Sequence, residues 1–132
     1  MAGAEGAARE EVLWSERFRP EDRLRRRADF LRCYRQGRRR NGTLSILYYA
    51  TNGCGRPRLG VTASRKVGNA VLRHRLKRRI REAFRRWERR GEMPAVDLVV
   101  HLKPEASRAT SGLFAEDLLR LWRGLLPRGG DR

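Results

Sequence analysis

The chain has 132 residues, enough for one domain and hardly two, and its 32 lysines and arginines against 15 aspartates and glutamates give a formal net charge of +17. The apolar share, counted with glycine and without tyrosine, lies within the roughly 45–50% of soluble globular domains, which excludes a wholly disordered basic tail and permits a packed core. No apolar run approaches the roughly 20 residues that span a bilayer, and the first residues hold no apolar signal-peptide segment.

The first predicted element is a short helix over 28–36. Gly37 follows it and is a natural residue to end a helix. Phe30 and Tyr34 are four residues apart, so they share one face of this helix.

Two strands are predicted next, over 44–51 and 58–64. The first alternates, with Ile46 and Tyr48 pointing one way and Tyr49 the other. A stretch rich in Gly, Asn and Pro separates the two strands and is a turn by composition. We therefore expect the two strands to form a hairpin.

A long helix is predicted over 70–90, with Asn69 as its N-cap and Gly91 at its end. Its apolar residues recur at helical spacing on one face, while the other faces are almost entirely Arg and Lys. The apolar face consists of Leu72, Leu76, Ile80, Ala83, Phe84 and Trp87.

A strand over 96–102 and a last helix over 113–126 complete the order helix, strands, long helix, strand, helix. This order predicts an α+β domain with two layers. We expect a single RNA-binding domain over 17–127, preceded by a flexible acidic extension over 1–16 and followed by a flexible tail over 128–132.

The excess of positive charge is concentrated in two segments. Residues 65–90 carry a net charge of +10, and residues 17–40 hold 11 arginines against three acidic residues. Arg makes up 29 of the 32 basic residues. Its planar guanidinium matches phosphate and stacks on bases, which favours nucleic acid, and RNA in particular, as the partner.

The residues that usually carry catalysis or bind metal are sparse. The chain has two histidines, His74 and His101, and no HExxH or CxxC pattern or carboxylate cluster. We therefore expect no catalytic residue and no metal site in the protein itself. Cys33 and Cys54 are too few for a disulfide framework, so a reducing cytoplasm is the expected location.

The long helix places its basic residues in two rows, Arg73–Lys77–Arg81 and His74–Arg78–Arg81. Because the apolar face holds the helix against a core, these rows form a rigid surface for phosphates. Like charges four residues apart destabilise an isolated helix by roughly 0.2–0.5 kcal/mol per pair. A helix with so many such pairs favours a bound polyanion over a merely solvated face.

The segment from Ser64 to Phe84 resembles the signature of the protein subunit of bacterial ribonuclease P. His74 departs from that signature, where Asn is usual. The first helix and the strands on either side of the motif also resemble the family, over roughly residues 17–127. The matching motif positions are Lys66, Gly68, Asn69, Ala70, Val71, Arg73, Arg75, Lys77, Arg78 and Arg81.

The resemblance implies an αβββαβα fold like domain 2 of ribosomal protein S5, with a left-handed β-α-β crossover. It implies that the RNA subunit, with Mg²⁺, hydrolyses the phosphodiester bond, while the protein binds that RNA and the 5′ leader of precursor tRNA. The implied RNA-binding residues are Arg65, Lys66, Arg73, His74, Arg75, Lys77, Arg78 and Arg81.

The resemblance also implies a leader cleft between the first helix and the sheet, formed by Phe30, Tyr34, Ile46 and Tyr48. Aromatic stacking tolerates any base, which suits a leader of variable sequence. Tyr49 points the other way and is expected in the core.

Other functions remain open from the sequence. An RNA-binding or ribosome-assembly protein could share this fold without any part in cleavage. A basic membrane-surface protein is less favoured, because the apolar face of the long helix is needed for the core. DNA is not an expected partner, because the predicted elements contain no pair of short helices joined by a tight turn.

Overall fold

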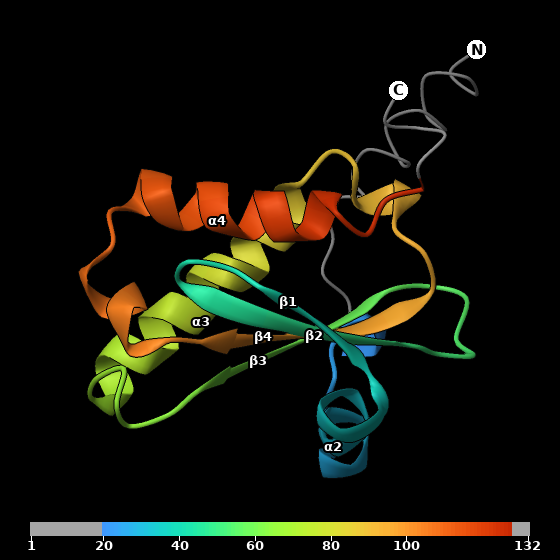
Figure 1. The fold of residues 1–132 in the computed structure, drawn as a ribbon, viewed down its shortest axis with the longest axis horizontal. Helices are drawn as coiled ribbons and strands as arrows, with labels where there is room; N and C mark the ends of the chain where they lie inside the picture. Colours follow the sequence, from blue (N-terminus) through green and yellow to red (C-terminus); the bar gives the residue numbers. More distant parts are fainter. Residues whose placement is uncertain (1–19, 128–132) are drawn as a thin grey trace.

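The computed structural model describes residues 20–127, which form a four-stranded sheet with helices on both sides (Figure 1). The predicted order of helix, strands, long helix, strand and helix is confirmed, with three short 3-10 helices in addition. The elements are η1 Pro20–Asp22, α2 Arg27–Gln36, β1 Arg38–Asn41, β2 Ser45–Thr51, β3 Arg58–Ala63, α3 Ala70–Arg86, η2 Arg90–Glu92, β4 Val96–Leu102, η3 Pro104–Arg108 and α4 Ser111–Arg123.

The sheet has the order β1-β2-β4-β3, so the predicted hairpin of β2 and β3 is wrong. β4 pairs with β2 in antiparallel fashion and with β3 in parallel, and it separates the two. The loop between β2 and β3 therefore crosses two strand spacings, about 10 Å, instead of turning back on its own strand. Composition marks such a loop as a turn but does not show which strand fills the gap.

β1 is an edge strand that the sequence did not predict from its pattern. It consists of Arg38, Arg39, Arg40 and Asn41, with no apolar residue, and pairs with β2 through the backbone. A charged edge strand is a common means of preventing sheets from associating edge to edge.

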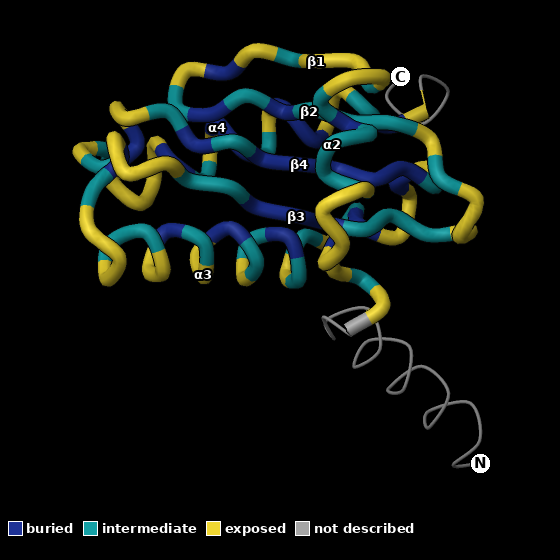
Figure 2. The backbone as a smooth tube through the Cα atoms, turned by 90° about the horizontal axis from the view of Figure 1, so that it is seen from below, coloured by how far each residue is buried: buried dark blue, intermediate teal, exposed yellow. Residues whose placement is uncertain are grey.

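The two faces of the sheet differ in how they are covered (Figure 2). On one face α3 and α4 pack on the main core, which includes Leu47, Leu98 and Trp122, each with no exposed surface. On the other face α2 packs over a small second cluster of Leu24, Cys33 and Val99. The far side of the sheet is thus covered by a single ten-residue helix.

The helix ends follow local chemistry. Asn69 and Thr110 cap α3 and α4, accepting hydrogen bonds from the backbone of Leu72 and Leu113. α3 ends at Arg86, before the predicted residue 90, because the backbone of Trp87 is extended. The indole of Trp87 then packs against Trp122, with ring centroids 5.8 Å apart, as the chain turns back towards β4.

The parallel pair β3 and β4 is joined through α3, which gives the expected β-α-β unit. The left-handed sense of its crossover stays a prediction. The expected extension over 1–16, residues 17–19 and the expected tail over 128–132 lie outside the described residues. Within residues 20–127, no helix is long and apolar enough to cross a membrane.

Candidate nucleic-acid interface

The predicted basic motif begins in the turn between β3 and α3. Gly68 has a φ of 156°, and a Cβ there would lie 2.6 Å from the side chain of Leu72, so glycine is required. The Asn69 side chain then accepts a hydrogen bond from the Leu72 backbone at 2.9 Å. This turn presents the exposed side chains of Arg65 and Lys66 immediately before α3.

α3 brings Arg73, Lys77 and Arg81 into one row, as predicted. The pKa of Lys77 is lowered, first by partial burial and then by the positive charges of Arg81 and Arg73. The pKa of Arg81 is lowered, first by burial and then by Arg23. Arg23 belongs to the basic segment that precedes α2, so the two basic segments of the chain meet here. Mutual repulsion of this kind favours binding to a polyanion.

The second predicted row lines a shallow hollow on the exposed side of α3. Val71 lies in it with 67% of its surface exposed, an unusual place for a large apolar side chain. The hollow therefore offers an apolar contact surrounded by cations, which suits the sugar and phosphate of RNA. Its lining residues are Val71, His74, Arg75, Arg78 and Arg81.

Acidic residues neutralise the end of this region but not the motif. Glu82 pairs with Arg85 at 2.7 Å, and Glu92 pairs with Arg89 at 3.0 Å. Within residues 20–127, none of the eight predicted RNA-binding side chains forms an ion pair. The positive charge of residues 65–81 is therefore available to a ligand.

The other predicted site lies on the opposite face of the sheet, where α2 meets β2. The rings of Tyr34 and Tyr48 meet edge to face, with centroids 4.7 Å apart. His101 of β4 lies beside them, 6.2 Å from the ring of Tyr34 and 6.5 Å from that of Tyr48. All three side chains are partly exposed. Together they form what we call the aromatic surface.

A hydrogen-bonded chain orients this surface. The hydroxyl of Tyr34 lies 2.8 Å from Oγ1 of Thr62, which in turn lies 2.8 Å from Nδ1 of His101. Burial lowers the pKa of His101, so its imidazole is neutral at pH 7. A neutral imidazole fixed through Nδ1 presents its other nitrogen as a donor or an acceptor.

Phe30 and Ile46 extend the aromatic surface in different ways. Ile46 lies opposite His101 in the sheet register and is half-buried beside it. Phe30 lies against Gly60, where a Cβ would come within 2.6 Å of the ring, and packs on the small core with Leu24. The structure thus places Phe30, Tyr34 and Tyr48 around the same small core, and Ile46 beside them in the register of the sheet, opposite His101.

The sequence prediction missed His101 and Thr62 as parts of this site. Alternation placed His101 on the face of its strand away from the main core, which was the available signal. The partner strands were unknown, however, and the register that brings Thr62 opposite His101 follows from the order of the sheet. Register also places Arg39 opposite Tyr48, on the same face, at the outer edge of the aromatic surface.

The sequence can be compared with those of known proteins. The ribonuclease P family profile matches residues 18–126. The chain belongs to the ribonuclease P protein family. The ribonuclease P protein component of Syntrophobacter fumaroxidans is 38% identical over 108 residues, which cover 82% of this chain and 91% of that protein. The component of Brucella suis is 36% identical over 107 residues, covering 74% and 75%.

Solved structures of the family share the fold. The RNase P protein of Staphylococcus aureus superposes with a TM-score of 0.73 at 29% identity, over 80% of this chain and 98% of that one. The RNase P protein of Thermotoga maritima gives a TM-score of 0.71 at 34% identity, again over 80% and 98%. The αβββαβα order expected from the resemblance is therefore the order of the family.

Proposed function

We propose that this protein is the accessory subunit of ribonuclease P. It binds the catalytic RNA and the single-stranded 5′ leader of precursor tRNA, and so promotes endonucleolytic removal of the leader. Family membership supports the enzyme, and one observation carries the division of roles: the protein has a basic surface without ion pairs on α3 and an aromatic surface beside α2, on the opposite face of the sheet. We also propose that it acts in the cytoplasm.

The basic surface suits double-stranded and structured RNA. Its cations are held on a helix whose apolar face is buried through Leu76, Ile80 and Phe84, so their spacing is fixed before RNA arrives. Preorganised guanidinium groups bind phosphate with little loss of side-chain entropy. We assign the RNA-binding residues of the motif to this role.

The aromatic surface suits the leader. Tyr34 and Tyr48 offer ring faces and edges to unpaired bases, and stacking contributes roughly 1–3 kcal/mol per base without reading its identity. Arg65 and Lys66 follow Thr62 by a few residues, so the basic turn begins close to the end of β3 that carries Thr62. A single strand lying on the aromatic surface would thus have cations for its phosphates nearby.

Mg²⁺ is proposed to act through the RNA subunit. Within residues 20–127, no group of three or more His, Cys, Asp or Glu side chains lies close enough together to hold a metal ion. We assign the protein residues no metal-dependent step. Their role is to bind and orient RNA.

The proposal is tested by substrate affinity. The protein is reconstituted with a bacterial ribonuclease P RNA, and the Kd is measured for precursor tRNA and for mature tRNA. We expect the protein to tighten binding of the precursor much more than that of the mature product. Equal tightening of both would remove the leader-binding role and leave only general RNA binding.

A further inference from the structure

α2 has a small apolar contact with the sheet, through Phe30, Cys33 and Tyr34. It has ten residues, and Cys33 is the one among them that is fully buried. Yet α2 carries Tyr34, whose position against Tyr48 creates the aromatic surface. A polar anchor also fixes the helix on this face.

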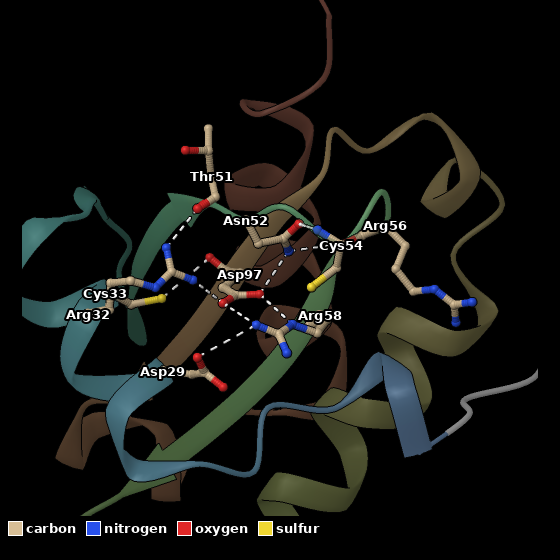
Figure 3. A network of polar contacts seen from close by, with 9 residues as sticks. All are labelled: Asp29, Arg32, Cys33, Thr51, Asn52, Cys54, Arg56, Arg58 and Asp97. Carbon is tan, nitrogen blue, oxygen red and sulfur yellow. Dashed lines mark hydrogen bonds and ion pairs between the residues drawn. The ribbon is translucent and has the colours of Figure 1, made fainter.

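That anchor is the carboxylate of Asp97, in β4 directly beneath α2 (Figure 3). Asp97 has no exposed surface. It accepts two hydrogen bonds from Arg58 and one from Asn52, each at 2.8 Å, and it pairs with Arg32 of α2. Arg32 also donates to the backbone carbonyl of Thr51 at 2.7 Å. One carboxylate thus joins α2, β3, β4 and the loop after β2.

The charges within this group balance. Asp97 and Asp29 face Arg32 and Arg58, with Asp29 at 3.7 Å from Arg58. In a chain with a net charge of +17 these two arginines are neutralised, so they are poor candidates for phosphate contacts. Loss of a cationic partner leaves a buried carboxylate uncompensated and strongly destabilises the folded protein. Movement of α2 away from the sheet would separate Arg32 from Asp97 and is therefore unfavourable.

The residues of α2 that reach the Asp97 anchor and the aromatic surface are close together in the helix. Arg32 and Tyr34 are two residues apart, and both reach the sheet, to Asp97 and to Thr62 respectively. A shift of α2 that broke the first contact would also separate the rings of Tyr34 and Tyr48.

We propose that Asp97 is a positioning residue for leader binding: through Arg32 it fixes α2 so that Tyr34 completes the aromatic surface. The inference rests on the proposed function, because it assigns Asp97 to the same leader-binding site. Asp97 itself touches no RNA, since it is covered by α2.

The first test compares Asp97→Asn with wild type in the reconstituted enzyme. The substitution keeps the size of the side chain and removes its charge. We expect the affinity ratio between precursor and mature tRNA to fall by about fivefold or more, the effect of one lost stacking contact. Affinity for the ribonuclease P RNA alone should change little, because α3 lies against the other face of the sheet.

Asp117→Asn is the matched control. Asp117 is likewise buried, and its carboxylate accepts hydrogen bonds from the backbone of Thr43 and Leu44, from Ser45 and from Arg120. It fastens α4 to the β1–β2 turn on the opposite side of the sheet. We expect this variant to lose stability but to keep the wild-type preference for precursor tRNA.

Thiol labelling under native conditions reports both the exposure and the pKa of Cys33. Burial and Asp97 raise that pKa, whereas Arg32 lowers it, so faster labelling in Arg32→Met, described below, can come only from greater exposure. Cys33 faces the sheet, and its thiol contacts the backbone carbonyl of Asp97 at 3.6 Å. Burial raises the pKa of Cys33 to about 11, so this thiol reacts slowly, whereas Cys54 is exposed. We expect Asp97→Asn to speed labelling of Cys33 at least severalfold, and Asp117→Asn to leave it unchanged.

Arg32→Met tests the same contact from the helix and leaves Asp97 paired with Arg58, so it applies if Asp97→Asn does not fold. It should reproduce both effects. Faster labelling of Cys33 with an unchanged affinity ratio would overturn the positioning role, and so would unchanged labelling. A wild-type protein without any precursor preference would instead overturn the proposed function, because that result does not depend on a variant.

Discussion

Tyr48 and Tyr49 are neighbours in the chain but belong to opposite faces of the sheet. Tyr48 meets Tyr34 and His101 on the α2 side, while Tyr49 packs against the main core. This difference is why the proposed leader contact is assigned to Tyr48 and not to its neighbour.

Replacing Tyr48 by Ala is expected to weaken binding of leader-bearing precursor tRNA by about 5- to 150-fold, since stacking contributes roughly 1–3 kcal/mol per base. Affinity for mature tRNA should stay the same, which a paired Kd measurement would show. Tyr49→Phe is the control and should change neither affinity. Equal losses for both RNAs in Tyr48→Ala would make Tyr48 a structural residue.

His101 is expected to make stability depend on pH. Burial lowers its pKa in the folded protein, whereas the unfolded chain titrates near the usual value of about 6.5. Below that value the unfolded state binds more protons, so the free energy of unfolding falls as pH drops from 7 towards the folded pKa. Burial raises the pKa of Tyr34, whose ring faces His101, so its hydroxyl stays neutral in this range.

The measurement is the urea midpoint of unfolding at pH 7 and at pH 5. His101→Gln removes the titrating group and should lose less stability on acidification than wild type does. The same pH dependence in both proteins would show that other groups account for it.

Residue-level prediction succeeded where a motif is contiguous and failed where a site depends on register. The spacing of Arg73, Lys77 and Arg81 fixes their alignment on any helix, so their row could be predicted. The grouping of Thr62 with His101 needs the parallel pairing of β3 and β4, which no local pattern encodes. Asp97 was missed for the same reason, because its three partners come from separate elements.

At the level of elements, Asn69 fixes the start of α3, the helix that carries most of the basic motif. The Asn69 cap satisfies a backbone donor that would otherwise be unpaired. Asn69→Ala should lower the free energy of unfolding by about 1 kcal/mol, which lowers Tm by roughly 4 °C for a domain of this size. Asn69→Ser retains a capping oxygen, so its Tm should fall by less than that of Asn69→Ala. Equal losses of Tm in a thermal melt would show that the cap contributes little.

The strands illustrate why a periodic pattern predicts elements better than their pairing. The residues of β4 alternate clearly, and its predicted bounds of 96–102 are those observed. β1 has no apolar residue, so it had no pattern to detect, and only pairing with β2 makes it a strand. The wrong hairpin of β2 and β3 has the same origin, because strand order depends on the crossover through α3.

Across the whole molecule, positive charge is sorted into paired and unpaired groups. Arg32, Arg58 and Arg85 form ion pairs with carboxylates, whereas the motif cations of residues 65–81 form none among the described residues. We therefore expect a motif cation to contribute more to the salt dependence of RNA binding than an arginine held in an ion pair.

Arg78→Gln should reduce the slope of log K against log salt concentration by roughly 0.7–0.9, the contribution of one neutralised phosphate. Arg85→Gln removes the same charge from a group paired with Glu82 and should change the slope by less. Titrations of RNA binding over a range of salt concentrations check both. Equal changes in slope would show that Arg85, despite its ion pair, contributes to RNA binding as much as Arg78 does.

The most direct test of the whole account is a cleavage assay at low Mg²⁺. Precursor tRNA is mixed with a bacterial ribonuclease P RNA, with this protein, or with both. We predict that the leader is removed only when RNA and protein are present together, and that the protein alone cleaves nothing. Cleavage that is unchanged by the protein, while the protein still binds RNA tightly, would contradict the accessory role and point to another RNA as its partner.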